Sequence, residues 1–320
     1  MCGIIGLFEK SSVKKNHGVS LIHNSAKKMV KGLKLLQHRG QDAAGLLSSR
    51  IKNGSFVVRK GPGFVREVFS DLAEKDFSEL EGNFLLGHTR YETVGGPSSL
   101  NIQPIQASAT QYNLKKKSYD VSTKNGCVKV PSMGIVHNGN IVNYFSLKEE
   151  LKELLKGKEQ TLKGQNDGEL ILRLFQSLFQ EEFCLSKESN KALPFWKIQI
   201  CIRRLSEKIE GGYALLLLID GLGLVAYRDP YGIRPLVYGK NERGQICFAS
   251  ETVALEGMGY KLIRDVMPGE VIFVGFDGSV KSAKLAFRSD FKRDPFTEAP
   301  CMFEQIYFAS SKSKIQGATV

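Results

Sequence analysis

The most apolar stretch of the chain, residues 213–227, is interrupted at its centre by Asp220 and Gly221. An Asp-Gly pair favours the tight turn of a β-hairpin, because these residues accept the positive φ values of a type I′ turn. The stretch therefore predicts two strands, at 214–219 and 222–227, joined by this pair. The interruption also leaves the stretch too short, and too polar at its centre, to cross a bilayer.

Short apolar segments elsewhere predict further strands, at residues 3–8, 56–59, 84–90, 133–137, 246–249 and 271–274. Apolar residues at helical spacing predict helices over 19–36 and 169–179, and mixed Lys and Glu predict a solvated helix over 146–159. Residues 107–132 are polar and rich in lysine, and they predict an inserted surface loop. Many strands with helices outside them indicate an α+β fold in which stacked sheets are covered by helices.

The composition is that of a globular protein from a reducing compartment. A hydrophobic fraction of 42% over 320 residues is enough to fill a sizeable core. The formal charge is +12, but the basic residues are spread out without interleaved aromatics, so we expect no nucleic-acid binding. The six cysteines include no C-x-x-C pair, and the N-terminus lacks the apolar run of a signal peptide. We therefore expect a cytoplasmic protein with no membrane attachment and no bound metal.

Cys2 is the first candidate for chemistry, because it directly follows the initiator methionine. Trimming of Met1 would leave Cys2 with a free α-amine, a group whose pKa is near 8 in model peptides. A thiol and its own α-amine provide a nucleophile and a base within one residue. Many proteins carry a cysteine at this position, so the interpretation needs support from other segments.

Three further polar segments can complete such a site. Arg90 ends an apolar segment and carries a planar fork that fits a carboxylate. Asn138 and the backbone N–H of Gly139 follow another apolar segment and can form an oxyanion hole. Asp167 opens a helix, where it can cap the helix or bind an amine. Each has a structural alternative too, namely an ion pair, an ordinary turn and a helix cap.

Taken together and in this order, the motifs resemble the class II glutamine amidotransferases of the N-terminal-nucleophile hydrolase superfamily. The resemblance is strongest to the glutaminase half of the amidophosphoribosyltransferase family and covers residues 2–278. It implies a four-layer αββα sandwich, in which two antiparallel sheets lie between helical layers. The segments that carry it are MCGIIG (1–6), LQHRGQDAAG (36–45), HTRY (88–91), HNGN (137–140), RDPYGIRPL (228–236), ASET (249–252) and RDVMPGE (264–270).

The resemblance implies a role for each matching residue. Cys2 would be the nucleophile, and Asn138 and Gly139 would form the oxyanion hole. Arg90 would bind the α-carboxylate of L-glutamine, and Asp167 would bind its α-ammonium group. The remaining substrate-site matches are Tyr91 and Thr93, in a mobile glutamine loop, and Arg39, in the segment beneath the nucleophile.

The sequence departs from this family in its second half. The diphosphate-binding loop of a phosphoribosyltransferase domain is absent, and residues 279–320 are expected to form a basic linker and the beginning of that domain. We therefore expect a glutaminase that supplies ammonia for phosphoribosylamine formation in purine biosynthesis. Its expected partner is a phosphoribosyltransferase domain or subunit, and the assembly is expected to be an oligomer.

No cofactor is expected in this chain. Magnesium with phosphoribosyl diphosphate would belong to the missing transferase half. Cys301 matches a position that ligates an iron–sulfur cluster in some members of the family, but the remaining ligands would also lie in that half.

Two other functions stay open at this point. The chain can be the glutaminase of another class II system, such as glutamate synthase or the hexosamine-forming synthase. It can also be a regulatory subunit that keeps the fold without the turnover. The motifs at 228–236 and 264–270 favour the purine branch, and the intact set of Cys2, Arg90 and Asp167 favours catalysis.

Overall fold

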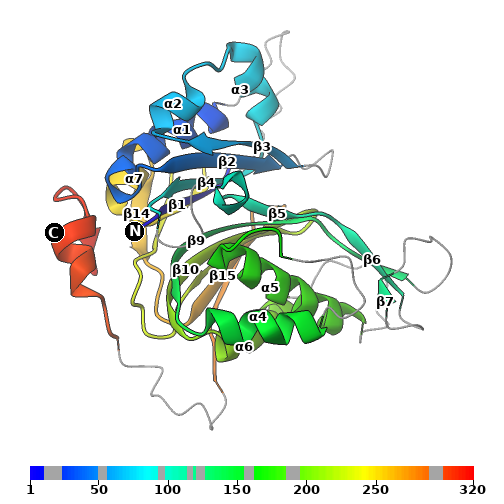
Figure 1. The fold of residues 1–320 in the computed structure, drawn as a ribbon. Helices are drawn as coiled ribbons and strands as arrows, with labels where there is room; N and C mark the ends of the chain where they lie inside the picture. The colour runs from blue at the N-terminus through cyan, green and yellow to red at the C-terminus, as the bar shows by residue number, and fades with distance from the viewer. Residues whose placement is uncertain are drawn as a thin grey trace.

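Two antiparallel sheets stacked face to face form the centre of the protein (Figure 1). The computed structural model describes residues 1–10, 24–49, 56–92, 98–113, 118–119, 127–154, 162–184, 195–287 and 298–320. The seven-stranded sheet has the order β14 (Lys261–Asp265), β12 (Val237–Lys240), β13 (Ile246–Ala249), β1 (Gly3–Phe8), β4 (Phe84–Arg90), β2 (Ala43–Ser49) and β3 (Phe56–Pro62). The six-stranded sheet has the order β16 (Val280–Lys284), β15 (Glu270–Gly275), β11 (Gly223–Arg228), β10 (Gly211–Ile219), β9 (Met133–Ile141) and β5 (Ile105–Ala107).

A layer of helices covers the outer face of each sheet (Figure 1). The helices over the seven-stranded sheet are α1 (Ser25–Leu35), α2 (Val65–Phe69), α3 (Glu74–Leu80) and α7 (Thr252–Gly257). Those over the six-stranded sheet are α4 (Tyr144–Leu154), α5 (Asp167–Cys184) and α6 (Phe195–Lys208). The αββα sandwich implied by the sequence is therefore confirmed. No helix in the described ranges is long and apolar enough to cross a membrane.

The continuous apolar runs arise because the central strands are buried on both faces. Along β10, Leu215 and Leu217 point into the core beneath α5 and α6, whereas Leu216 and Leu218 point into the core between the sheets. Side chains alternate between the faces of a strand, so a strand at the centre of four layers needs apolar residues at every position. The same rule produces the run in β1.

The β10–β11 hairpin forms as predicted, but its turn differs. Gly221 has a φ of 73°, and the N–H of Leu222 donates to the carbonyl of Ile219 at 3.0 Å. Asp220 does not have a positive φ, which a type I′ turn requires at both central positions. Only the glycine of the Asp-Gly pair therefore takes the left-handed conformation.

The interpretation of residues 107–132 as a surface loop is wrong for the part that the structure describes. Strands β6 (Thr110–Asn113), β7 (Ser118–Tyr119) and β8 (Cys127–Val130) form a separate three-stranded antiparallel sheet. It extends outward beyond the two main sheets (Figure 1). Thr, Tyr and Val in these short segments favour strands, and the lysines around them hid the pattern.

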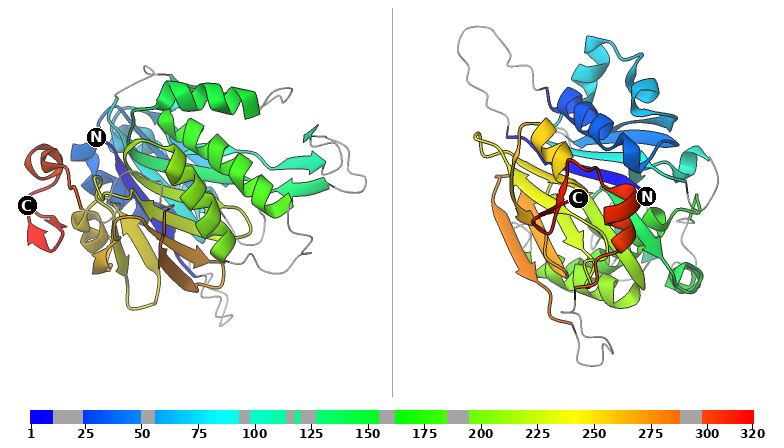
Figure 2. Two further views of the ribbon diagram at one scale, coloured as in Figure 1. Left: turned by 90° about the horizontal axis from the view of Figure 1, so that it is seen from below. Right: turned by 90° about the vertical axis from the view of Figure 1, so that its left-hand side faces the viewer.

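The C-terminal segment, residues 298–320, packs back onto the sandwich beside the N-terminus (Figure 2). It contains the short π-helix η3 (Glu304–Phe308) and a small hairpin of β17 (Lys314–Ile315) and β18 (Ala318–Thr319). Strand β16 also lies beyond the expected domain boundary at residue 278, and it pairs with β15 as the edge of the six-stranded sheet. The six-stranded sheet therefore continues past that boundary.

Candidate active site

The register of two neighbouring strands places Cys2 beside Arg90. Gly3 at the start of β1 pairs with Thr89 near the end of β4, so the residues just beyond this pair are also adjacent. The short 3₁₀ helix η1 (Gln37–Arg39) and Gly40 meet the same strand ends. A Cβ on Gly40 would lie only 2.5 Å from the carbonyl carbon of Arg90, so only glycine permits this approach.

A pocket opens where these strand ends face the end of β9 and the start of α5. It encloses about 360 Å³, open solvent included. It is lined by Cys2, Arg90, Tyr91, Gln103, His137, Gly139, Gln165, Asn166 and Asp167. The structure thus brings together the predicted nucleophile, the predicted carboxylate clamp and the predicted amine partner.

Asn138 and Gly139 lie within the last four residues of β9, and the two contribute differently. Gly139 lines the pocket, and a Cβ there would lie 2.2 Å from the carbonyl oxygen of Gly212 on β10, so a larger residue does not fit. Asn138 does not itself line the pocket, although its neighbours His137 and Gly139 do. It is fully buried, and neither polar atom of its carboxamide has a hydrogen-bond partner among the described residues. Buried amides are normally paired, so a donor left unused next to a pocket suits an oxygen that gains charge during a reaction.

Asp167 begins helix α5, but the side chain that caps the helix belongs to Asn166. The Oδ1 atom of Asn166 accepts a hydrogen bond from the N–H of Gly168 at 2.7 Å. Asp167 instead accepts one from the N–H of Ile141 through Oδ2 at 3.0 Å, and it lines the pocket. Burial raises the pKa of Asp167 above its ordinary value, so a positive ligand group would be needed to stabilise its charge fully.

Cys2 directly precedes β1, and its thiol lies 3.9 Å from the carbonyl oxygen of Tyr91. Burial raises the pKa of this thiol, so it needs a base to become a thiolate at neutral pH. The α-amine of the chain, carried by Met1, is also partly buried, and burial lowers its pKa from 8.0 to about 6. This amine leaves with Met1, and the nitrogen of Cys2 becomes a free amine next to the thiol only after that removal.

Arg39 lies beneath the nucleophile and outside the pocket. Its side chain is fully buried, and Nε donates to the carbonyl oxygen of Cys2 at 3.0 Å. The other two nitrogens donate to Glu251 and Glu304, each at 2.7 Å. The expectation that Arg39 belongs to the substrate-binding residues therefore needs correction, because its guanidinium is turned into a buried ion-pair network and supports the backbone of the nucleophile.

Glu251 anchors the other side of this network. Burial alone would raise the pKa of its carboxyl, but His38 and Arg39 outweigh burial and hold the pKa at about 2. His38 contacts Glu251 at 2.9 Å, and Ser313 of the C-terminal segment donates to it at 2.7 Å. The ASET motif, recognised in the sequence only as a family feature, thus supplies a charged partner for the arginine behind Cys2.

Gln103 was not identified from the sequence. Its Oε1 accepts a hydrogen bond from the N–H of His137 at 2.6 Å, and its Nε2 donates to the carbonyl of the same residue at 3.4 Å. Lys60 in turn donates to the carbonyls of Ile102 and Pro104, which flank the glutamine. This arrangement fixes the strand directly before Asn138, and no local pattern around residue 103 indicates it.

The predicted glutamine loop is only partly visible. Tyr91, at its beginning, lines the pocket and is 51% exposed, so it lies at the rim. Thr93 falls in 93–97, outside the described residues, and its predicted role stays a prediction.

Among the residues that the structure describes, no group of three or more His, Cys, Asp or Glu side chains could hold a metal ion.

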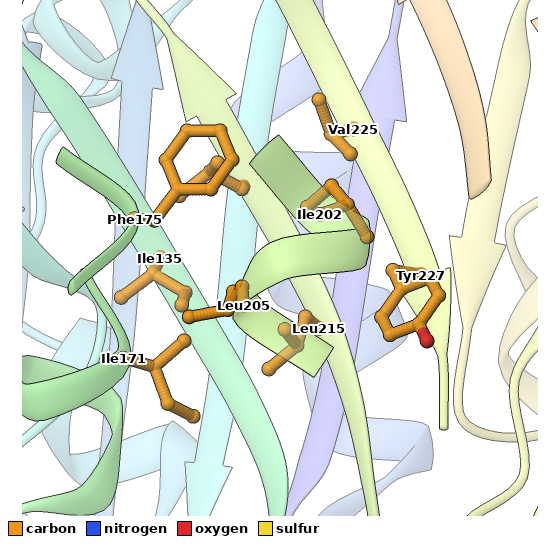
Figure 3. Close-up of a pocket in the computed structure, with 9 residues that line it drawn as sticks. Ile135, Ile171, Phe175, Ile202, Leu205, Leu215, Val225 and Tyr227 are labelled. Atoms are coloured by element: carbon orange, nitrogen blue, oxygen red, sulfur yellow. The ribbon is translucent and has the colours of Figure 1, made fainter. Parts of the chain in front are cut away.

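A second, smaller cavity has a different character (Figure 3). It lies between α5, α6 and the six-stranded sheet, and it is lined by Ile135, Ile171, Phe175, Ile202, Leu205, Leu215, Leu217, Val225 and Tyr227. The only polar lining group, the hydroxyl of Tyr227, is already bonded to Ser206 at 2.7 Å. With no polar group left to orient a ligand, this cavity is a packing gap in the core.

Comparison with known proteins agrees with this geometry. The family described as "Glutamine amidotransferase domain" matches residues 127–257. Residues 127–257 are therefore those of a glutamine amidotransferase domain. It is 34% identical over 323 residues to the amidophosphoribosyltransferase of Haemophilus influenzae, and 33% identical over 324 residues to that of Escherichia coli. Both alignments include the whole chain but 54% of the relative, so the chain spans about half the length of the curated relatives it matches.

Two solved structures are similar to this chain over nearly its whole length. A structure described as the allosteric regulatory enzyme of purine biosynthesis superposes with a TM-score of 0.70 at 26% identity, over 99% of this chain and 55% of that one. The glutamine phosphoribosylpyrophosphate amidotransferase of Bacillus subtilis gives a TM-score of 0.69, also at 26% identity and with the same coverage of the two chains. The resemblance stated from the sequence motifs is thereby confirmed.

Proposed function

We propose that this chain hydrolyses L-glutamine to glutamate and ammonia, with Cys2 as the nucleophile. The observation that carries the proposal is the single pocket in which Cys2 and Arg90 from one sheet meet Gly139 and Asp167 from the other side. Few small substrates need a nucleophile together with one positive and one negative anchor. An amino acid whose side chain is attacked needs the nucleophile for that side chain, the positive anchor for its α-carboxylate and the negative anchor for its α-ammonium group.

The anchors fit the two charged ends of glutamine. Arg90 binds the α-carboxylate, because a planar guanidinium can donate two parallel hydrogen bonds to it. Asp167 binds the α-ammonium group, which also satisfies a carboxylate whose pKa is raised by burial. Tyr91, at the rim of the pocket, and Thr93 are the further residues proposed to bind the substrate. The side-chain amide is then left pointing toward Cys2.

The reaction proceeds in two halves. The α-amine of Cys2, freed by removal of Met1, takes the thiol proton as sulfur attacks the amide carbon. The resulting oxyanion accepts hydrogen bonds from Asn138 and from the N–H of Gly139. The C–N bond then breaks, the amine returns its proton to the leaving group, and ammonia departs from a thioester. Water attacks this thioester through a second oxyanion and releases glutamate and the free thiol.

The test is glutamate release from glutamine by the purified chain. Intact-mass measurement should show loss of Met1, and Cys2→Ala should abolish turnover because it removes the attacking sulfur. Cys301→Ala, which removes another partly exposed thiol, should keep turnover. A chain with an uncleaved N-terminal tag should be inactive, because its Cys2 has no free amine. Full activity of Cys2→Ala or of the tagged chain would refute the mechanism.

We further propose that the ammonia is passed to a phosphoribosyltransferase half, in a cytoplasmic oligomeric assembly that forms phosphoribosylamine. The support is the name and length of the relatives, which are amidophosphoribosyltransferases about twice as long as this chain. The apolar face of η3 supports docking there, since Ile306 is 62% and Tyr307 71% exposed. The chain itself needs no cofactor and no nucleic acid in this scheme, and magnesium with phosphoribosyl diphosphate binds to the transferase half.

The matching experiment compares glutamate release with and without a phosphoribosyltransferase and its substrate phosphoribosyl diphosphate. We expect low turnover by the chain alone and stimulation only when both are present. Coupling matters because ammonia released into water at neutral pH is mostly protonated and unreactive. High turnover that does not respond to the partner would show that this chain works as a stand-alone glutaminase.

A further inference from the structure

The C-terminal segment is joined to the support of the active site from behind. Its backbone bonds to the loop between β11 and β12, where Ala299 N–H donates to the carbonyl of Tyr231 at 2.8 Å. Further along, Ser313 donates to Glu251, and the N–H of Lys314 donates to the hydroxyl of Thr252 at 2.9 Å. In Figure 2 the segment lies directly beside the N-terminus.

Glu304 is the deepest residue of this segment. It is 2% exposed, although its neighbour Gln305 is exposed. One carboxylate oxygen accepts a hydrogen bond from Arg39 at 2.7 Å, and the other accepts one from Arg234 at 3.2 Å. A buried carboxylate is stable only when its charge is matched, so these two arginines define where Glu304 can lie.

The contact continues from Glu304 to the nucleophile through one side chain. Arg39 holds Glu304 with one nitrogen, Glu251 with the second, and the carbonyl oxygen of Cys2 with the third. The two glutamates approach the guanidinium separately, so together they fix its orientation. Its remaining nitrogen, Nε, then fixes the backbone of Cys2.

We propose that Glu304 is a positioning residue for the nucleophile, so that the docking of residues 298–313 sets the activity of the glutaminase site. The proposal rests on the proposed function, because it concerns the turnover of the same thiol. A residue 265 positions from Arg39 in the chain thus completes the support of Cys2. Undocking it removes one of the two carboxylates that orient Arg39, and small displacements of a reacting group reduce rates steeply.

The test uses three variants of the full chain. Glu304→Gln keeps the size of the side chain but removes its charge, Glu304→Asp keeps the charge but withdraws it by one methylene, and Gln305→Ala is the control on the exposed face of the same helix. We expect Glu304→Gln to lower kcat by roughly tenfold or more, with KM within about threefold, since the substrate anchors are untouched. Glu304→Asp should recover part of the loss, and Gln305→Ala should behave as wild type.

A second measurement separates this proposal from the glutaminase proposal. The rate at which iodoacetamide alkylates Cys2 reports the state of the thiol without any turnover, and it should fall in Glu304→Gln. If the wild type released no glutamate, the proposed function would fail, while the alkylation rates would still decide the role of Glu304. If Glu304→Gln does not fold, Glu304→Asp decides alone. Wild-type kcat and wild-type alkylation in a folded Glu304 variant would overturn the proposal.

Discussion

Asn138 and Gln103 are both buried carboxamides, yet only Gln103 is seen to use its polar atoms. The oxygen and nitrogen of Gln103 both bond to the backbone of His137, whereas those of Asn138 have no partner among the described residues. A buried polar group without a hydrogen-bond partner lowers the free energy of unfolding by about 1–3 kcal/mol. Such a cost is understandable if the amide serves an oxygen that gains charge only during the reaction.

Replacing this amide should therefore separate activity from stability. Asn138→Leu has nearly the same volume and removes the orphan polar atoms, so the melting temperature should stay the same or rise. Without the donor, kcat should fall by about 10²–10³, with little change in KM. Steady-state kinetics of glutamate release and calorimetry measure the two effects.

Ser49→Ala is the matched control for this prediction. Its hydroxyl is also buried without a partner among the described residues, but it lies at the far end of β2, away from the pocket. It should leave kcat unchanged. A kcat within twofold of wild type in Asn138→Leu would exclude Asn138 from the oxyanion hole.

At the scale of the elements, the site depends on a loop pressed against a strand end. Gly40 follows η1, and the carbonyl of Arg90 accepts a hydrogen bond from the N–H of Asp42 at 3.0 Å. Gln37 helps to fix the turn by donating to the carbonyl of Gly40 at 2.6 Å. The loop thus sets where both Arg39 and Arg90 lie.

Gly40→Ala should disturb both arginines at once. The new methyl group would lie 2.5–2.8 Å from backbone atoms of Arg90, which cannot move as a side chain tip can. We expect a loss of about 1–3 kcal/mol in the free energy of unfolding, and a higher KM for glutamine as Arg90 shifts. Gly61→Ala is the control, because its methyl group would meet only Val68 at an ordinary 3.6 Å. Equal effects of the two substitutions would contradict this explanation.

The sequence predicted the elements where a local pattern carries the information. Apolar runs located β1, β4 and β10, and helical spacing located most of α5, because these patterns follow directly from burial on known faces. The strands β6, β7 and β8 were missed, since each is only two to four residues long and the polar residues and lysines around them hide a strand pattern. The helix was expected to start at residue 19, and that position lies in 11–23, outside the described residues.

The support of the site was less predictable because its contacts are distant in sequence. Gln103 and His137 are 34 residues apart, Arg39 and Glu251 are 212 apart, and Arg39 and Glu304 are 265 apart. No spacing rule links such pairs. The residues that line the pocket were recognised through motifs, whereas the residues that hold them in place required the fold.

At the scale of the whole molecule, the sandwich buries ionisable groups close to the site. His88 on β4 and His137 on β9 are both buried, and burial lowers the pKa of each from 6.5 to about 3. The nearby positive charge of Arg90 lowers the pKa of His88 further. Both rings are therefore neutral in the folded protein throughout the physiological range.

These histidines should make the fold sensitive to mild acid. As pH falls from 6.5 toward 3, the unfolded chain binds a proton at each ring and the folded chain does not, so stability is lost with falling pH. Each ring contributes about 1.4 kcal/mol per pH unit inside this window. Glu251, with a folded pKa of about 2, weakens the fold only below its ordinary pKa of 4.5. Between pH 6.5 and 4.5 the histidines can therefore be observed separately from that ion pair.

Urea unfolding of wild type and His88→Gln at several pH values between 6.5 and 4.5 tests this directly. The glutamine cannot take up a proton, so the free energy of unfolding of the variant should fall less steeply, by about 1.4 kcal/mol per pH unit. Comparing the slopes cancels the groups that both proteins share, and any constant loss from imperfect packing drops out as well. Parallel pH profiles for the two proteins would mean that His88 takes up its proton in the folded state as readily as in the unfolded chain, and that burial between the layers does not keep it neutral.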